Sequence, residues 1–210
     1  TAATPTVIMG NTVNVIADTA ANIASKPIGI VVAVPIAVMQ TSSTVNINNA
    51  QITTSEDLVV RSMTDMQVSS IAAVQNLAGI GLGVSVSVVS STATATLSPQ
   101  SIVTVGRDLF VQSDVIDRNY TNATAYGDVS SKINIGVAVN VTDLNLLASV
   151  DGTANVTRNV NVTTKASKLP VEGQKGIAFP TFYNGVSASA SIDPNASFGN
   201  PLDDLANAGI

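Results

Sequence analysis

Residues 106–113 read Gly-Arg-Asp-Leu-Phe-Val-Gln-Ser, and related stretches occur 51 residues earlier and 51 residues later. The earlier stretch, residues 55–62, reads Ser-Glu-Asp-Leu-Val-Val-Arg-Ser, and the later one, residues 157–164, reads Thr-Arg-Asn-Val-Asn-Val-Thr-Thr. A shorter copy at residues 10–15 reads Gly-Asn-Thr-Val-Asn-Val. An apolar pattern that recurs at a fixed spacing is typical of proteins built by stacking similar units along one direction.

A second pattern follows the first in the same order. Residues 83–88 read Gly-Val-Ser-Val-Ser-Val, and similar stretches occur at residues 136–141 and 185–190, with an earlier copy at residues 33–38. Apolar residues at every second position predict a half-buried strand. A third element, Ala-Thr-Ala-Thr-Leu at residues 93–97, precedes turn-forming residues in each repeat.

We therefore predict an all-β chain folded as a right-handed parallel β-helix, or β-solenoid, made of strands of four to six residues. Because a coil of such a fold typically takes about 20 to 25 residues, the 51-residue repeat is expected to contain two coils. The stretch 63–77 also admits one short helix. Residues 1–210 are expected to form a single solenoid domain or fragment, with repeats at about 10–54, 55–105, 106–156 and 157–192 and a tail or linker over 193–210.

Composition excludes several classes of function. The chain has no His and no Cys, so zinc sites of the usual kind, Ser-His-Asp triads and thiol nucleophiles are excluded. The net charge is −5 and no basic cluster is present, so nucleic acid is a poor candidate partner. No catalytic residue, cofactor, metal site or membrane span is predicted.

The order Gly-Val-x-Val-x-Val, Ala-x-Ala-x-Leu and Gly-x-Asp-Leu-x-Val-x-Ser, over residues 10–165 and again at Gly185, resembles the repeats of large secreted bacterial adhesins. These are filamentous adhesins of the leukotoxin type and haemagglutinin-repeat proteins. The resemblance implies a β-helical passenger region, export from a prokaryotic cell, and a structural or adhesive role at the cell surface. It brings no catalytic residues. We expect a non-enzymatic adhesin stalk or filament subunit, with other copies or further repeats as partners end to end, and surface glycans as a further partner.

A module that binds or degrades polysaccharide on the same scaffold is the alternative. Degradation would need clustered carboxylates near a basic residue, and the best cluster is Asp114, Asp117, Arg118 and Asp128, which we interpret as a solvated turn with a surface ion pair. Phe179, Phe182 and Tyr183 could stack on a sugar or pack a loop against the body. Glycosylation sequons occur at Asn119, Asn122, Asn140, Asn155, Asn161 and Asn195.

Asp108 recurs as Asp57 and Asn159 at the same place in the repeat, which predicts a corner residue whose side chain caps a turn. Leu109 and Val111 are then expected to point inward. The equivalent pairs, expected two coils away, are Leu58 with Val60 and Val160 with Val162.

Overall fold

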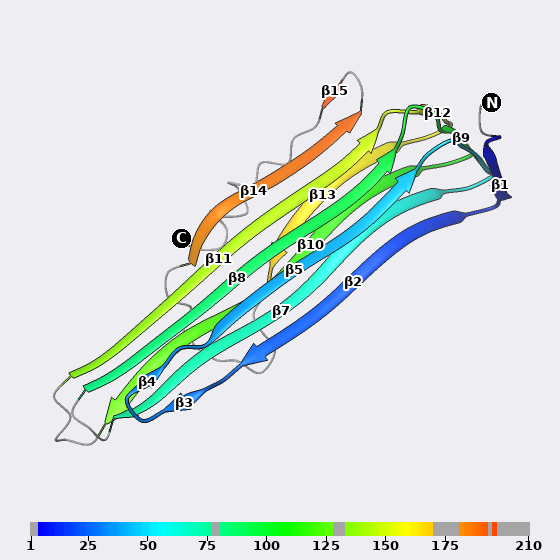
Figure 1. Ribbon diagram of the computed structural model, residues 1–210. Helices are drawn as coiled ribbons and strands as arrows, with labels where there is room; N and C mark the ends of the chain where they lie inside the picture. Colours follow the sequence, from blue (N-terminus) through cyan, green and yellow to red (C-terminus); the bar gives the residue numbers. More distant parts are fainter. Residues whose placement is uncertain (1–3, 77–79, 128–132, 170–180, 193–194, 197–210) are drawn as a thin grey trace.

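The computed structural model describes residues 4–76, 80–127, 133–169, 181–192 and 195–196. Strands separated by one repeat pair directly and in parallel (Figure 1). Leu109 pairs with Leu58 on one side and with Val160 on the other, 51 residues away in each direction. One repeat is therefore one layer of the stack, and the expectation of two coils per repeat is wrong.

The strands form three sheets, each with one strand from successive layers. Sheet A is short and has the order β1-β6-β9-β12: β1 (Thr6–Gly10), β6 (Ala50–Thr54), β9 (Ile102–Val105) and β12 (Thr153–Val156). Sheet B has the order β13-β10-β7-β2, with β3 beside β7: β2 (Val13–Ser25), β3 (Ile28–Gly29), β7 (Leu58–Asn76), β10 (Leu109–Gly127) and β13 (Val160–Lys168).

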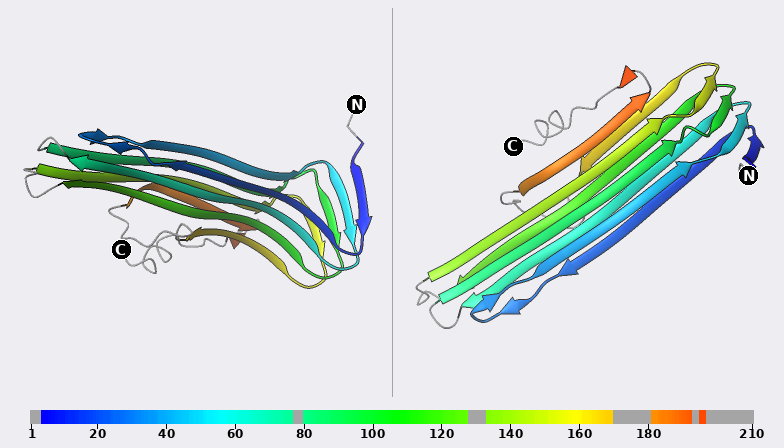
Figure 2. Two further views of the ribbon diagram at one scale, coloured as in Figure 1. Left: turned by 90° about the horizontal axis from the view of Figure 1, so that it is seen from below. Right: turned by 45° about the horizontal axis from the view of Figure 1, so that its top comes forward.

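Sheet C faces sheet B across the interior (Figure 2). Its order is β15-β14-β11-β8-β4, with β5 also beside β8, and only the β14–β15 pair is antiparallel. Its strands are β4 (Val32–Ala33), β5 (Ile36–Ile47), β8 (Ile80–Leu97), β11 (Ile133–Val150), β14 (Thr181–Ile192) and β15 (Asn195–Ala196). A layer thus runs along sheet A, out along sheet B and back along sheet C.

Strand length explains why the two-coil prediction fails. β7 and β10 each have 19 residues and β8 and β11 each have 18, instead of the four to six expected, so a single circuit uses the whole repeat. At about 3.3 Å per residue such a strand is roughly 60 Å long, whereas four layers at about 4.8 Å span under 20 Å. The long axis of the molecule therefore follows the strands, as Figure 1 shows, and not the stacking direction.

The short helix that residues 63–77 admitted is not formed, because β7 runs as a strand from Leu58 to Asn76. Its inward positions are buried at every second residue, which is the period of a strand and not of a helix. In the part of the chain that the structure describes, no helix is long and apolar enough to cross a membrane.

The apolar core lies near sheet A, where all three sheets meet. Leu58, Val60, Leu109 and Val111 are each fully buried there, which confirms that these pairs point inward. They lie in adjacent layers. Val160, in the last described layer of sheet B, is 37% exposed.

Farther from sheet A, buried polar side chains alternate with a second apolar cluster that includes Met66, Val89 and Leu144. In this part of the interior, serine hydroxyls connect the two long sheets. Ser62 of β7 donates a hydrogen bond to the backbone carbonyl of Ser43 on β5 at 2.7 Å. One repeat later, Ser113 of β10 donates to the carbonyl of Ala93 on β8 at 2.6 Å. Each serine on sheet B donates across the interior to a carbonyl in the preceding layer of sheet C. These hydrogen bonds hold the two sheets together at the same place in successive layers. Small inward residues let the sheets approach closely enough for this.

Candidate functional site

The corner between sheets A and B carries a ladder of side-chain hydrogen bonds. Asp57 Oδ1 accepts a hydrogen bond from the backbone N–H of Asp108 at 3.1 Å. Asp108 Oδ1 in turn accepts from the backbone N–H of Asn159 at 3.2 Å and from its Nδ2 at 2.8 Å. The prediction that Asp108 is a corner residue is confirmed, but its side chain caps the next layer instead of its own turn.

Each carboxylate of this ladder also faces an arginine of the following layer. Arg107 Nε lies 3.6 Å from Asp57 Oδ1, and Arg158 Nη1 lies 3.8 Å from Asp108 Oδ2. These carboxylates are therefore engaged in holding layers together. Among the described residues no group of three or more acidic side chains is placed to hold a metal ion.

Alternation along β10 separates the members of the predicted carboxylate cluster. Asp117 points into the interior and is 1% exposed, whereas Asp114 and Arg118 lie on the outer face. Arg118 forms a two-point ion pair with Asp65 of the neighbouring layer, with both N–O distances 3.0 Å. Arg118 does form a surface ion pair, but with a residue outside the predicted cluster. The predicted turn is wrong because these residues lie within a strand. Asp128 lies outside the described residues.

Asp114 has its own partner on the outer face of sheet B. Its Oδ2 lies 3.3 Å from Nε of Arg61 on β7, although the two groups are not aligned for a hydrogen bond. Both ion pairs on this face therefore join neighbouring layers. The carboxylates of β10 do not converge on a common point.

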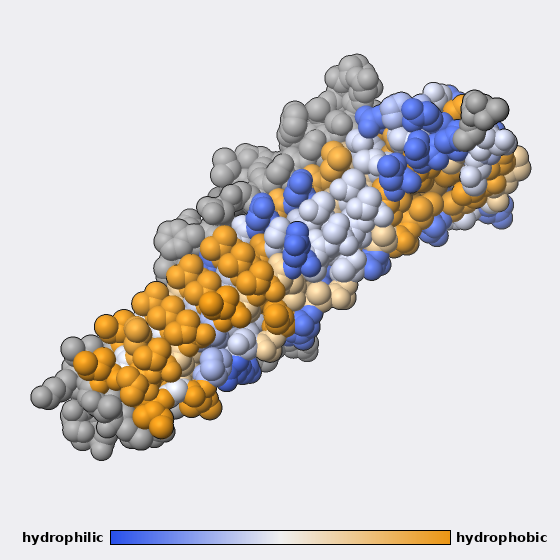
Figure 3. All heavy atoms as spheres, viewed as in Figure 1, coloured by the Kyte–Doolittle hydropathy of each residue, from blue (hydrophilic) through white to orange (hydrophobic). Residues whose placement is uncertain are grey.

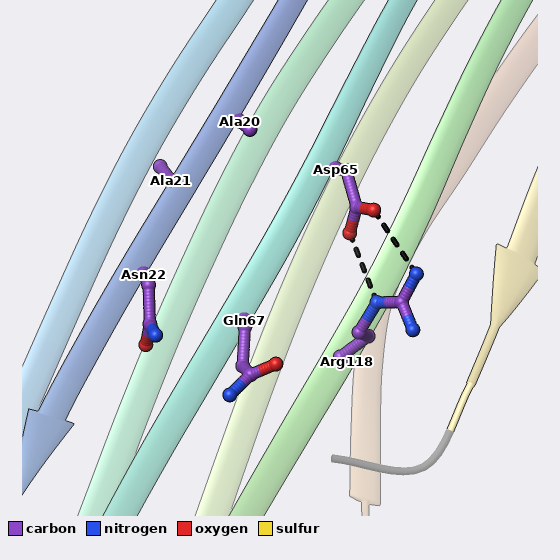
Figure 4. Close-up of a pocket in the computed structure, with 6 residues that line it drawn as sticks. All are labelled: Ala20, Ala21, Asn22, Asp65, Gln67 and Arg118. Carbon is purple, nitrogen blue, oxygen red and sulfur yellow. Dashed lines mark hydrogen bonds and ion pairs between the residues drawn. The ribbon is translucent and has the colours of Figure 1, made fainter. Parts of the chain in front are cut away.

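A shallow depression lies on the outer face of sheet B (Figure 4). Asn22 of β2, Gln67 of β7 and Arg118 of β10 are in register, one from each layer, and form its polar wall. The Asp65–Arg118 ion pair and the small Ala20, which is in register with Asp65, border this row. A row of two amides and a guanidinium about 4.8 Å apart can donate and accept hydrogen bonds along an extended ligand.

The interior acid Asp117 belongs to a polar network between β10 and β11. Thr142 Oγ1 lies 3.5 Å from Asp117 Oδ2, and no hydrogen-bond partner for Oδ1 is present among the described residues. Burial raises the pKa of Asp117 to about 6, and the positive charge of Lys168 and the hydrogen bond from Thr142 partly oppose this effect. Lys168 is the residue that pairs with Asp117 in the next layer of sheet B.

Two of the predicted glycosylation positions are part of this same network. Asn119 and Asn140 are 8% and 4% exposed, and Asn119 Nδ2 donates to Asn140 Oδ1 at 2.6 Å across the interior. A glycan on either amide is incompatible with this packing, so both are removed as glycosylation sites of the folded chain. Of the other sequons, Asn155 is exposed. Asn122 and Asn161 are half-buried.

The remaining predicted site residues cannot be placed as side chains. Phe182 and Tyr183 lie on β14, where they pair with Val141 and Thr142 of β11, but their side chains lie outside the described part of the structure. Phe179 and the side chain of Asn195 also lie outside it. The sugar-stacking role of the aromatic residues therefore stays a prediction.

The outer surface of sheet C carries a feature that the sequence analysis missed. The valines of the Gly-Val-Ser-Val-Ser-Val stretch point outward, while Ser85 and Ser87 between them are fully buried. We name the outward side chains at this end of sheet C the aliphatic face. It comprises alternate residues of 32–38, 80–88 and 135–141, all of them Val, Ile or Leu.

The aliphatic face is exposed and forms a continuous patch (Figure 3). Ile36 and Val38 are each 61% exposed, Ile80 is 55% exposed, and Val137 is 42% exposed. Toward sheet A the outward residues of the same strands become mostly polar, for example Gln40, Ser90 and Asp143, and the patch ends. No family model, curated protein or solved structure matches this chain.

Proposed function

We propose that this chain is a structural and adhesive segment of an exported prokaryotic surface protein, acting without catalysis as the stalk of an adhesin or as a subunit of an extracellular filament. We further propose that its layers coil in the right-handed sense. The observation that carries the proposal is the in-register parallel pairing of each layer with the next, with a spacing of 51 residues between the second, third and fourth layers of sheets A and B. A layer that presents the same donors and acceptors as the one before it can be followed by another of the same kind.

The first layer supplies an edge at which such addition could occur. Val13 of β2 donates its backbone N–H to Asp57 in the second layer. Because successive residues of a strand direct their backbone groups to opposite edges, Asn14 and Ile16 direct theirs away from the stack. Within the described residues, β2 pairs with β7 alone. Unpaired edges of this kind favour addition of a further strand.

Two proline variants of β2 test assembly through this edge. Ile16→Pro removes an N–H that faces the open edge, so it should block strand addition while leaving the fold intact. Val15→Pro removes an N–H that is bonded to the second layer, so it should lower the melting temperature. Sedimentation velocity and electron microscopy of the purified chain measure assembly, and circular dichroism measures folding.

Concentration-dependent growth that Ile16→Pro abolishes would support the filament subunit. Growth that Ile16→Pro leaves unchanged would overturn assembly through this edge. A chain that never grows would exclude the filament subunit and leave the stalk. Release of new reducing ends or unsaturated products from a polysaccharide panel would overturn the non-enzymatic role itself.

The depression on sheet B supports a second candidate, binding of an extended polysaccharide. Asn22, Gln67 and Arg118 present a polar row to solvent on a surface that has little net charge locally. Gln67→Ala should weaken binding to a responsive glycan on an array. Gln112→Ala, on the outer face of β10 outside the depression, is the matched control. Equal binding by both variants and the parent chain would exclude this site.

A further inference from the structure

The aliphatic face is the largest feature of the described surface that the proposed function does not use. It spans three layers with the same side-chain chemistry in each: Leu82 pairs with Val32 and Ile135, and Val86 pairs with Ile36 and Val139. Folded single chains rarely expose a continuous apolar patch above a few hundred Å². Three strand segments of seven to nine residues, spaced about 4.8 Å apart, give a flat footprint of roughly 360 Å².

We propose that the aliphatic face is the interface of a homodimer, in which the same face of a second copy covers it. Two such faces in contact bury about 700 Å² in total, which is below the roughly 1,000 Å² of a stable specific interface and in the range of a weak one. The dimer should therefore be weak and dependent on concentration. This proposal does not depend on assembly at the strand edges, because the face lies on the broad side of sheet C and not at the end of the stack.

The composition of the face favours a second copy over a lipid surface. Membrane-binding surfaces combine apolar side chains with Lys, Arg, Trp or Tyr at the level of the headgroups. The outward positions of the face contain none of these, and the first charged outward residue beyond it is Asp143 of β11. A flat, uncharged aliphatic sheet surface is complementary to itself, as in the packing of two sheets face to face.

The position of the face also determines how the two copies are oriented. It occupies only the end of sheet C farthest from sheet A, and the outward residues nearer sheet A are mostly Ser, Thr and Asn, with Gln40, Asp143 and Leu147 as the exceptions. An antiparallel pair related by a twofold axis overlaps the aliphatic ends and leaves both polar halves in water. A parallel pair would bring the polar halves, including Thr92 and Thr94, into the contact. The antiparallel arrangement is therefore the one proposed.

Two lysine variants on β8 test the interface. Val86 lies at the centre of the face, and Thr94 lies on the same strand, layer and side but in the polar half. In sedimentation velocity at up to about 100 µM, a range that detects weak interfaces, the parent chain and Thr94→Lys should dimerise. Val86→Lys should be monomeric, with an unchanged circular dichroism spectrum. A monomeric parent chain, or equal loss in both variants, would overturn the proposal.

Single cysteines test the orientation, because the chain has no native Cys. Val84→Cys, near the expected twofold axis, should form a disulfide-linked dimer on mild oxidation, and Thr94→Cys should not. Efficient crosslinking of Thr94→Cys would overturn the antiparallel arrangement.

Flotation with phosphatidylcholine vesicles tests whether the face binds lipid instead. If the parent chain does not dimerise but binds the vesicles, and Val86→Lys abolishes that binding, the face is a lipid-binding surface. Ile16→Pro should leave this dimer unchanged, which separates it from assembly at the strand edge.

Discussion

Asp108 accepts a hydrogen bond from the backbone N–H of Asn159 in the next layer, as Asp57 accepts one from the backbone N–H of Asp108. Neighbouring backbone groups of this corner, such as the N–H of Arg107, bond to carbonyls of the preceding layer. The aspartate side chain supplies the acceptor for the N–H of Asp108 or Asn159. The repeated Asp or Asn therefore holds the corners of successive layers in register.

Asp108→Ala should lower the free energy of unfolding by about 1 to 3 kcal/mol, because the N–H of Asn159 loses its acceptor. Asp108→Asn keeps an oxygen in the same place and should cost less than about 1 kcal/mol, since the ion pair with Arg158 is long, at 3.8 Å, and the Arg158 side chain is half-exposed. Urea denaturation measures both values. Equal losses in the two variants would show that the charge of Asp108 stabilises the corner, and not its hydrogen bond with the N–H of Asn159.

Gly106, two residues before Asp108, has a different requirement. A Cβ built on Gly106 would lie 2.1 Å from the backbone oxygen of Ser55, and backbone at a tight corner cannot move away easily. Gly106→Ala should therefore destabilise the chain by more than about 2 kcal/mol. Gly10 lies at the same corner in the first layer, in register with Thr54, and the atom nearest to a Cβ built on it is in the Val13 side chain at 3.2 Å. Gly10→Ala should be nearly neutral. Thermal unfolding measures both variants, and a similar loss of stability in Gly106→Ala and Gly10→Ala would contradict this explanation.

Stability should fall as the pH rises from about 4 to about 6, because of Asp117. Burial raises the pKa of Asp117 to about 6 from 3.8, so the folded chain binds this proton more tightly than the unfolded chain does. The favourable contribution is fully present below about pH 4 and is lost as the pH passes through 6. A difference of about two pKa units corresponds to about 3 kcal/mol.

Asp117→Asn should remove this pH dependence and raise the free energy of unfolding at pH 8 by up to about 3 kcal/mol. Urea denaturation between pH 4 and pH 8 measures the effect. Asp114→Asn, on the outer face of the same strand, should retain the pH dependence of the parent chain. Lys168→Met should move the pKa of Asp117 higher still, because the charge of Lys168 lowers it. A parent chain with flat stability across this range would contradict the prediction.

The fixed spacing of the Asp-Leu-x-Val pattern was enough to predict parallel stacking, the corner position of Asp108, and the inward direction of Leu109 and Val111. Strand length could not be predicted in the same way, because Gly-Val-x-Val and Ala-x-Ala-x-Leu were interpreted as separate strands. In the structure both belong to β8, Ile80–Leu97. That division also produced the prediction of two coils.

The same division hid the aliphatic face and the polar interior. Along a continuous strand the side that is buried at Ala93, Ala95 and Leu97 must also be buried at Ser85 and Ser87. The valines between them must then point outward. Considered as an isolated strand, residues 83–88 instead favour burial of the valines, because apolar side chains are more often inside. Continuity of the alternation over 18 residues was the signal that could have identified the face.

Exchanging polarity at two adjacent residues of β8 tests this assignment. Ser87 is fully buried and its hydroxyl contacts Asn119 and Thr121, so Ser87→Val would overfill a narrow interior and leave polar partners without a hydrogen bond. The expected loss in the free energy of unfolding is about 3 kcal/mol, combining overpacking with an unsatisfied group. Val86→Ser changes an outward side chain and should cost less than about 1 kcal/mol in the monomer. Urea denaturation at a protein concentration well below that of dimerisation measures both, and a greater loss for Val86→Ser would show that the valines, and not the serines, face the interior.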